Sequence, residues 1–198
     1  MKVFIINSHL SYSPADGRLN AAAQEVARDF FQDRGDTVIM TKISDGYDPH
    51  VEAQKMLDAD LVILQTPIHW FSAPWIWKKY ADEVFSVGLG NHTFTTGDGR
   101  TRKDPSKKYG SGGLMAPRRF MMCTTWNAPR TAFNDPDNPA FRGCHLDDVF
   151  TDIYSMFRFC GFEIVPCFGM FDVIKNPTTN DDLAQYRLYL EKCFPQKQ

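Results

Sequence analysis

Three short segments combine hydroxyl, histidine or aromatic residues with glycine and proline, and these segments are the best candidates for ligand chemistry. Residues 11–20 read Ser-Tyr-Ser-Pro-Ala-Asp-Gly-Arg-Leu-Asn. Backbone N–H groups at a helix start, together with serine hydroxyls and Arg18, predict a phosphate site here. The alternative is a helix that is simply capped by Asp16, and such caps are far more common than phosphate sites. The segment is not a P-loop, because it lacks the pattern GxxxxGK[ST].

The second and third segments are candidates for binding a flat ring. Residues 66–74 read Thr-Pro-Ile-His-Trp-Phe-Ser-Ala-Pro, and residues 125–129 read Thr-Trp-Asn-Ala-Pro. We expect Trp70, Phe71 and Trp126 to form aromatic walls, as in many ligand pockets. His69 would donate a hydrogen bond, although a single loop histidine is more often a plain surface residue. Backbone N–H groups after Thr125 would face a ligand carbonyl, and the alternative is a proline turn closed by its asparagine.

A long polar loop over residues 88–117 carries a further candidate, because loops of this length inside a compact domain are usually functional or disordered. It contains Tyr109 and a basic run, most examples of which are merely solvated. Residues 110–113 do not fit the dinucleotide pattern GxGxxG. The histidines lack metal-ligand spacing and no GxSxG nucleophile motif occurs, so we expect no metal site.

The hydrophobic pattern shows which elements would position these segments. Apolar runs predict strands at residues 3–7, 37–41, 61–65, 120–125 and 162–171. Helical periodicity predicts helices at residues 19–31, 49–59, 75–87, 146–160 and 181–194. This alternation predicts an α/β fold, a doubly wound five-stranded parallel sheet of order 2-1-3-4-5. Ligands bind at the carboxyl ends of such strands, and the three segments follow the first, third and fourth strands.

Composition limits the function classes. The chain has 198 residues without internal repeats or linkers, which predicts a single domain over residues 1–198. A net charge of −2 argues against a nucleic-acid binder. We expect no membrane span, since no apolar stretch approaches the ~18 residues that one requires. Five cysteines without CxxC pairs, and a start that does not read as a signal peptide, predict a reducing, cytoplasmic location.

Taken together, these segments resemble the flavodoxin-like NAD(P)H:quinone reductases, and most closely their bacterial modulator of drug activity B branch. The resemblance covers nearly the whole chain and is most specific over residues 98–113, which read Asp-Gly-Arg-Thr-Arg-Lys-Asp-Pro-Ser-Lys-Lys-Tyr-Gly-Ser-Gly-Gly. It implies bound FAD, with the phosphates at residues 15–22. The cofactor-binding residues that it implies are Ala15, Asp16, Gly17, Arg18, Leu19, Asn20, Ala21, Ala22, Ile68, His69, Trp70, Phe71, Tyr109, Thr125, Trp126, Asn127 and Ala128. Close relatives tend to carry Gly-Trp at the position of Ile68-His69, which indicates a differently shaped loop.

The resemblance also implies the reaction, which is two-electron reduction of a quinone by NAD(P)H in ping-pong fashion. Since the flavin N5 would carry the chemistry, we name no catalytic side chain, and we favour NADPH over NADH. The relatives imply a homodimer, and the helix over residues 75–87 agrees, since it has aromatic residues on more than one face. The alternatives are a flavodoxin-type electron carrier, an azo- or nitroreductase of the same fold, and a redox-regulated interaction protein. Fold alone does not separate them.

Overall fold

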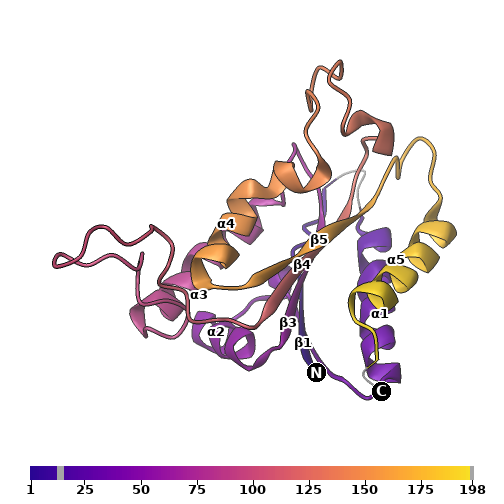
Figure 1. The fold of residues 1–198 in the computed structure, drawn as a ribbon. Coiled ribbons are helices and arrows are strands. Elements are labelled where there is room, and N and C mark those ends of the chain that lie inside the picture. The colour runs from indigo at the N-terminus through magenta and orange to yellow at the C-terminus, as the bar shows by residue number, and fades with distance from the viewer. Residues whose placement is uncertain (13–15, 197–198) are drawn as a thin grey trace.

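The computed structural model describes residues 1–12 and 16–196 and has one parallel sheet at its centre (Figure 1). Its five strands run in the order β2-β1-β3-β4-β5, and each pairs in parallel with its neighbours. The strands are β1 (Lys2–Asn7), β2 (Thr37–Lys42), β3 (Leu61–Pro67), β4 (Arg119–Thr125) and β5 (Glu163–Met170). The predicted flavodoxin-like order 2-1-3-4-5 is confirmed.

Helices cover both faces of the sheet. They are α1 (Arg18–Asp33), α2 (Pro49–Asp58), α3 (Trp75–Gly90), α4 (Thr151–Cys160) and α5 (Thr179–Cys193). Helices α1 and α5 pack on one face, and α2, α3 and α4 lie on the other (Figure 1). The helix predicted over residues 146–160 begins instead as a 3-10 turn, Leu146–Phe150. In that turn Asp147 faces β5 and accepts a hydrogen bond from the Cys167 backbone N–H at 2.8 Å.

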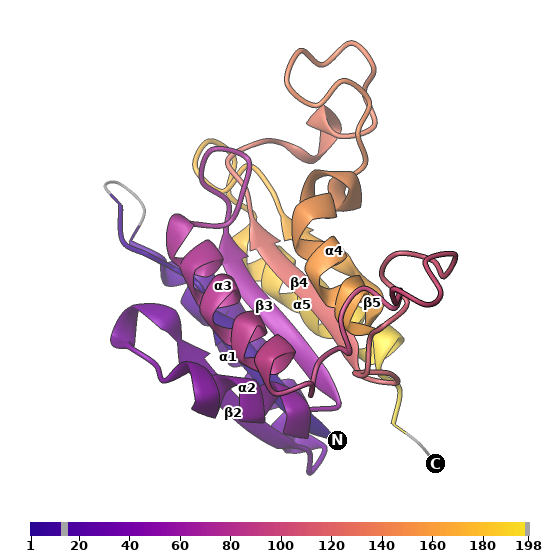
Figure 2. The same ribbon diagram turned by 90° about the vertical axis from the view of Figure 1, so that its left-hand side faces the viewer.

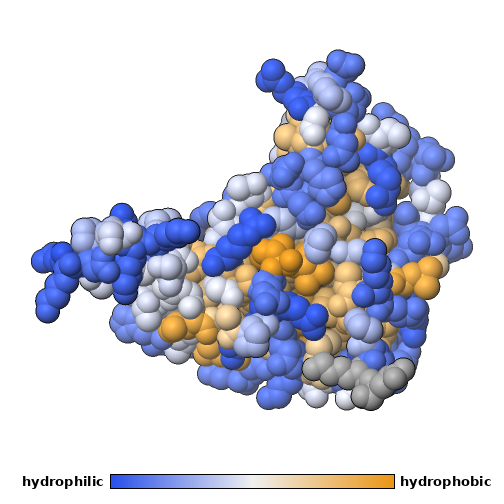
Figure 3. All heavy atoms as spheres, viewed as in Figure 1, coloured by the Kyte–Doolittle hydropathy of each residue, from blue (hydrophilic) through white to orange (hydrophobic). Residues whose placement is uncertain are grey.

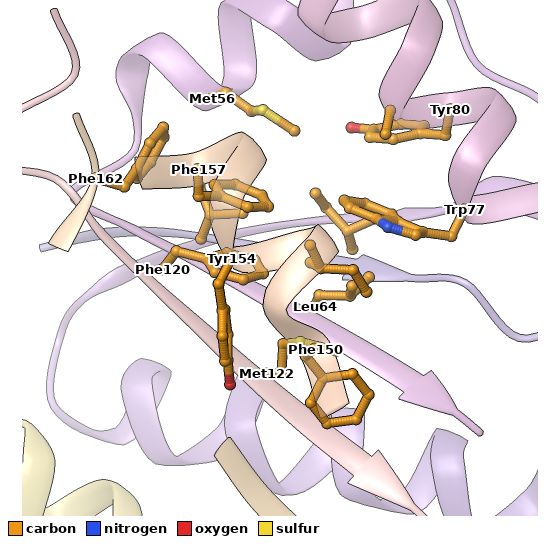
Figure 4. Close-up of a cluster of buried hydrophobic side chains, with 14 of the residues drawn as sticks. Met56, Leu64, Trp77, Tyr80, Phe120, Met122, Phe150, Tyr154, Phe157 and Phe162 are labelled. Carbon is orange, nitrogen blue, oxygen red and sulfur yellow. The ribbon is translucent and has the colours of Figure 1, made fainter. Parts of the chain in front are cut away.

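Aromatic side chains fill the core between the sheet and α3 and α4 (Figure 4). The rings of Phe120 on β4 and Phe157 on α4 are stacked at 3.4 Å between centroids, and Trp77 of α3 stacks on Phe157 at 6.3 Å. Every residue of β3 is buried, because helices cover both of its faces. Such burial is the main favourable contribution to folding and makes the sheet a rigid platform. In the part of the chain that the structure describes, every helix is too short or too polar to cross a bilayer.

Two segments project from this body (Figures 1 and 2). Residues 134–145 project from the carboxyl-terminal edge of the sheet, near the loops that follow β3 and β4. Residues 96–112, called the arm below, project from the side of α3 and α4 nearer the amino-terminal edge. A bridge between Thr95 and Gly113 closes the base of the arm. The parallel crossover explains this separation, because a helix that follows a strand returns the chain to the opposite edge.

Candidate functional site

The start of α1 has the features of an anion site. Gly17 is the N-cap residue in the left-handed region, with φ of 78°, and the first helical turn reads Arg-Leu-Asn-Ala. Gly17 has no side chain to cap the helix, and the Arg18 backbone N–H donates to Asp16 Oδ1 at 3.4 Å. The N–H groups of Leu19 and Asn20 donate to no acceptor among the described residues, so they keep their partial positive charge. The predicted alternative, a cap by Asp16, is correct in part: the N-cap residue is Gly17, but the Asp16 carboxylate accepts from the Arg18 N–H and also pairs with Arg18 Nε at 2.8 Å. Helix starts of this kind bind phosphates and other anions.

His9 provides a second observation that points to a ligand at the same place. Its side chain is only 7% exposed, and its Nε2 has no hydrogen-bond partner among the residues that the structure describes. The ring lies against Gly17 so closely that a methyl group built on Gly17 would be 2.3 Å from Nε2. Buried polar atoms in proteins are nearly always hydrogen-bonded. An unpartnered imidazole nitrogen at a helix start therefore indicates a ligand acceptor such as a phosphate oxygen.

A network of buried amides holds the start of α1 against the sheet. Asn20 Nδ2 donates to Asn7 Oδ1 at 2.9 Å, and Gln65 Nε2 donates to Asn20 Oδ1 at 3.0 Å. Asn7 Oδ1 also accepts from the His9 backbone N–H at 2.8 Å. Since Asn7 ends β1 and Gln65 lies near the end of β3, this network fixes the helix start at the switch point between these strands. The side chain of Asn20 thus acts within the protein, although it was predicted as a cofactor contact.

The loop after β3 presents two aromatic side chains to solvent. His69 and Ser72 exchange backbone hydrogen bonds at 2.9 and 3.2 Å, so the two residues between them form a tight turn. Trp70 and Phe71 both lie in the left-handed region, with φ of 50° and 69°, although neither is glycine. Trp70 is 94% exposed and Phe71 is 52% exposed. Non-glycine residues held in this conformation cost about 1–3 kcal/mol each and cluster at ligand sites.

The imidazole of His69 contacts the loop between β1 and α1. Its ring packs edge-on against Tyr12, with 5.0 Å between centroids. Its Nε2 is buried, and no described residue forms a hydrogen bond with it. Burial, and after it the charge of the neighbouring His9, hold the pKa of His69 below its ordinary value. The structure therefore places, after two different strand ends, two imidazoles whose Nε2 atoms have no partner among the described residues.

The loop after β4 joins this edge through its backbone. The Ile68 N–H donates to the Thr125 carbonyl at 3.0 Å, which ties the two loops together. Asn127 is exposed and Ala128 is half-buried. Across residues 1–12 and 16–196, the backbone N–H groups of Asn127 and Ala128 donate to no protein acceptor. These two donors are thus available to a ligand carbonyl.

The expected aromatic wall at Trp126 is wrong. Its indole is 3% exposed, and its Nε1 donates to Thr124 Oγ1 at 2.9 Å. The ring packs against Phe133 and Phe141, which come from the loop beyond it. The side chain turned inward because burying a large indole with its N–H satisfied is more favourable than exposing it. Phe141 also contacts Phe71 at 5.6 Å, so the wall at this edge consists of Trp70 and Phe71.

Tyr109 lies apart from the other predicted site residues within one chain. It is on the arm, 72% exposed, with its ring 5.6 Å from Phe159 and 5.4 Å from the guanidinium of Arg100. The arm projects near the amino-terminal edge, whereas the three loops lie at the carboxyl-terminal edge (Figures 1 and 2). Tyr109 and the basic run of the arm therefore lie away from the three loops of their own chain.

The remaining predicted residues fall into two groups. Ala21 is exposed, while Leu19 and Ala22 are half-buried along α1. Ala15 lies outside the described residues. His9 was missed by sequence reasoning, although a histidine two residues after a buried strand was a signal that could have found it.

Two further observations concern other parts of the chain. A cavity of about 930 Å³ lies at the amino-terminal edge, and Asp36, which lines it, pairs with the chain's amino group and with Arg34. No group of three metal-ligating side chains occurs within the described residues.

Comparison with known proteins agrees with this geometry. Residues 1–193 match the family model described as flavodoxin-like fold. The chain is 34% identical over 194 residues to the NADPH:quinone oxidoreductase MdaB of Haemophilus influenzae, covering 98% of this chain and 100% of that protein. It is 36% identical over 194 residues to an uncharacterized protein of Schizosaccharomyces pombe, covering 98% of this chain and 97% of that one.

Solved structures share the fold. A Klebsiella pneumoniae protein assigned as a quinone reductase superimposes with a TM-score of 0.78 at 21% identity, covering 100% of this chain and 86% of that one. General stress protein 14 of Treponema denticola, solved with FMN, gives a TM-score of 0.66 at 16% identity, covering 96% and 98%. At these identities the likeness concerns the fold alone. The family match and the full-length relatives show that this chain belongs to the flavodoxin-like fold family, in the group that includes Haemophilus influenzae MdaB.

Proposed function

We propose that this protein is a flavin-dependent NAD(P)H:quinone oxidoreductase. The net reaction is NAD(P)H + H⁺ + quinone → NAD(P)⁺ + hydroquinone. Two features at one sheet edge carry the proposal. The first is the start of α1, with glycine as its N-cap residue, beside His9, whose buried Nε2 has no partner among the described residues; the second is the exposed aromatic turn. The first feature suits a phosphate and the second suits a flat ring. A full-length relative named as an NADPH:quinone oxidoreductase supports the same function.

The residues present fit a flavin nucleotide. The α1 start over residues 16–22 and His9 would hold its phosphates, and residues 68–71 and 125–128 would hold its ring. The unpaired N–H groups of Asn127 and Ala128 would orient the polar edge of the ring. Trp70 offers a stacking surface for the acceptor. When bound, the flavin supplies hydride transfer between the nicotinamide and the quinone.

We propose FAD as the flavin and a homodimer as the active form. A single chain leaves its arm away from its own loops, so the arm has the reach to complete the site of a second copy. An open, mostly apolar groove of about 420 Å³ lies beside the arm between α3 and α4, lined by Phe85, Leu89, Tyr109, Met156 and Phe159 among others. Figure 3 shows the tip of the arm as hydrophilic, with hydrophobic spheres beside its base. A second copy would cover this groove and receive the adenosine end of FAD against the arm.

We favour NADPH over NADH, and a cytoplasmic location. Arg118 donates to the Leu57 carbonyl, and Arg119 lies over the Phe194 ring, so both are engaged within the protein. This leaves the exposed basic residues of the arm, such as Lys103 and Lys107, as partners for a 2′-phosphate. All five cysteines are free, which suits a reducing compartment.

The deciding experiment identifies the cofactor and follows its reduction. Mass spectrometry after heat release should find FAD, and FMN alone would contradict the FAD proposal.

Anaerobic titration should bleach the flavin in one two-electron step. Steady-state rates with NADPH and a small quinone should give parallel double-reciprocal lines. Two separated one-electron steps, with negligible quinone-dependent oxidation of NADPH, would favour the electron carrier. Light scattering should give the mass of a dimer.

A further inference from the structure

The two unpartnered imidazoles at the proposed phosphate site have a consequence beyond simple binding. We propose that His9 and His69 form a proton-linked pair, so that binding of the flavin nucleotide's phosphate is coupled to proton uptake and becomes tighter as the pH falls. This inference rests on the proposed function, because it concerns the same site. It adds a regulation of cofactor retention that comes from this chain's own two histidines.

Both rings pack against the segment that leads from β1 into α1. His9 follows β1 and packs on Gly17, the N-cap residue of α1, while His69 follows β3 and packs on Tyr12. The Nε2 atoms of both are buried and lack partners throughout the described residues. A neutral imidazole carries a single N–H, on either nitrogen, whereas the protonated ring donates from both. Only protonation guarantees that each Nε2 donates to a phosphate oxygen, and such charged hydrogen bonds are the stronger ones.

Among the residues that the structure describes, no carboxylate forms a hydrogen bond or ion pair with either ring. The loops over residues 67–74 and 125–129 carry no charged residue apart from His69 itself. Between β1 and the first turn of α1, the titratable and charged groups are Tyr12, Asp16 and Arg18. Tyr12 packs on His69, and Asp16 and Arg18 pair with each other at 2.8 Å. The amides of Asn7, Asn20 and Gln65 on the strand and helix side are neutral. The negative charge that a protonated pair requires must therefore come from a ligand.

The direction of the linkage follows from burial. Desolvation, and secondarily the charge of His9, hold the pKa of His69 below its ordinary value of about 6.5. The free protein therefore keeps His69 neutral near pH 7. A bound phosphate favours the protonated form, so the complex holds more protons than the free protein. Affinity then increases by up to about tenfold for each pH unit and each proton taken up, as pH falls through the window where uptake occurs.

The test is proton uptake, measured by calorimetry on cofactor-free protein. FAD is titrated in buffers of different ionisation enthalpy, which gives the number of protons bound with the ligand. We expect net uptake for the natural protein and a clear reduction for His69→Gln. Riboflavin, which lacks phosphate, should bind without uptake. His50→Gln is the matched control, because His50 is exposed on α2 and should change nothing.

His69→Gln carries the test because the turn that holds His69 is closed by backbone hydrogen bonds that do not involve its ring. Circular dichroism confirms that the variant is folded, and His9→Gln provides the second half of the pair. Equal proton uptake in His69→Gln and the natural protein, or equal uptake with riboflavin and FAD, would overturn the proposed proton linkage. If FAD binds without proton uptake, the linkage is wrong and the proposed function stands. If no flavin binds at any pH, both fail.

Discussion

Gly17 and His9 are in such close contact that a methyl group on Gly17 would lie 2.3 Å from Nε2 of His9. The contact joins the first residue before α1 to the loop that leaves β1. Two independent reasons require glycine at position 17. Its φ of 78° is in the left-handed region, and the imidazole fills the space that a side chain would need. The position of His9 at the proposed phosphate site therefore depends on Gly17.

Gly17→Ala should weaken FAD binding strongly. The new methyl group must displace the imidazole, which removes a phosphate donor and distorts the start of α1. Gly35→Ala is the matched control, because Gly35 has the same φ of 78° but nothing within 4 Å of the added methyl group. Both variants should lose about 1 kcal/mol of unfolding free energy from backbone strain. Equal FAD dissociation constants for the two variants, measured by fluorescence titration, would contradict the assignment.

Trp70→Ala should lower quinone turnover more than FAD content. Trp70 is 94% exposed, so its loss should change stability by less than about 0.5 kcal/mol. Loss of a stacking surface worth about 1 kcal/mol should reduce kcat/KM for the quinone by roughly fivefold to tenfold. Trp75→Ala, at the start of α3 and 61% exposed, serves as the control. An equal loss in that variant would show that Trp70 has no special contact with the acceptor.

Tyr80→Phe should destabilise the protein without touching the site. The Tyr80 hydroxyl donates at 2.9 Å to Glu52, which is 2% exposed and also accepts from Lys55 at 2.6 Å. Burial, and after it Glu52, raise the pKa of Tyr80, so its hydroxyl remains a donor. Loss of a bond to a buried charge should cost about 1.5–3 kcal/mol in urea unfolding.

Tyr47→Phe is the matched control for that experiment. Its hydroxyl donates at 2.6 Å to Glu83, whose side chain is 38% exposed and also pairs with a lysine. Water replaces such a partner easily, so this variant should lose less than about 1 kcal/mol. Equal losses for the two variants would show that the burial of Glu52 is unimportant.

Cofactor-free protein should lose stability as pH falls below about 6.5, and part of that loss should come from His69. The pKa of His69 is lower in the folded protein than in the unfolded chain, so the unfolded state binds protons more readily. The contribution of His69 to the free energy of unfolding is fully present when the pH is above its pKa in the unfolded chain. It is lost as the pH falls toward its pKa in the folded protein. Urea unfolding across this range should show a smaller decrease for His69→Gln. An identical pH dependence of the unfolding free energy in the natural protein and in His69→Gln would contradict this role of His69.

The sequence by itself determined the order of the sheet and the edge that carries the site. Continuous apolar runs alternating with helical patterns specify a parallel doubly wound sheet, because only such strands are covered on both faces. The carboxyl ends of parallel strands share one edge, so the segments after Asn7, Pro67 and Thr125 had to meet there. Local pattern was sufficient for these inferences.

Only the tertiary structure decided which side chains face the site. Trp126 turned into the core, because a pocket formed by Phe133, Phe141 and Phe150 receives its indole. Tyr109 came to lie away from the three loops, because α3 returns the chain to the opposite edge before the arm begins. His9 and His69 became neighbours although sixty residues separate them. Packing between distant segments decides such choices, and no local pattern of residues encodes them.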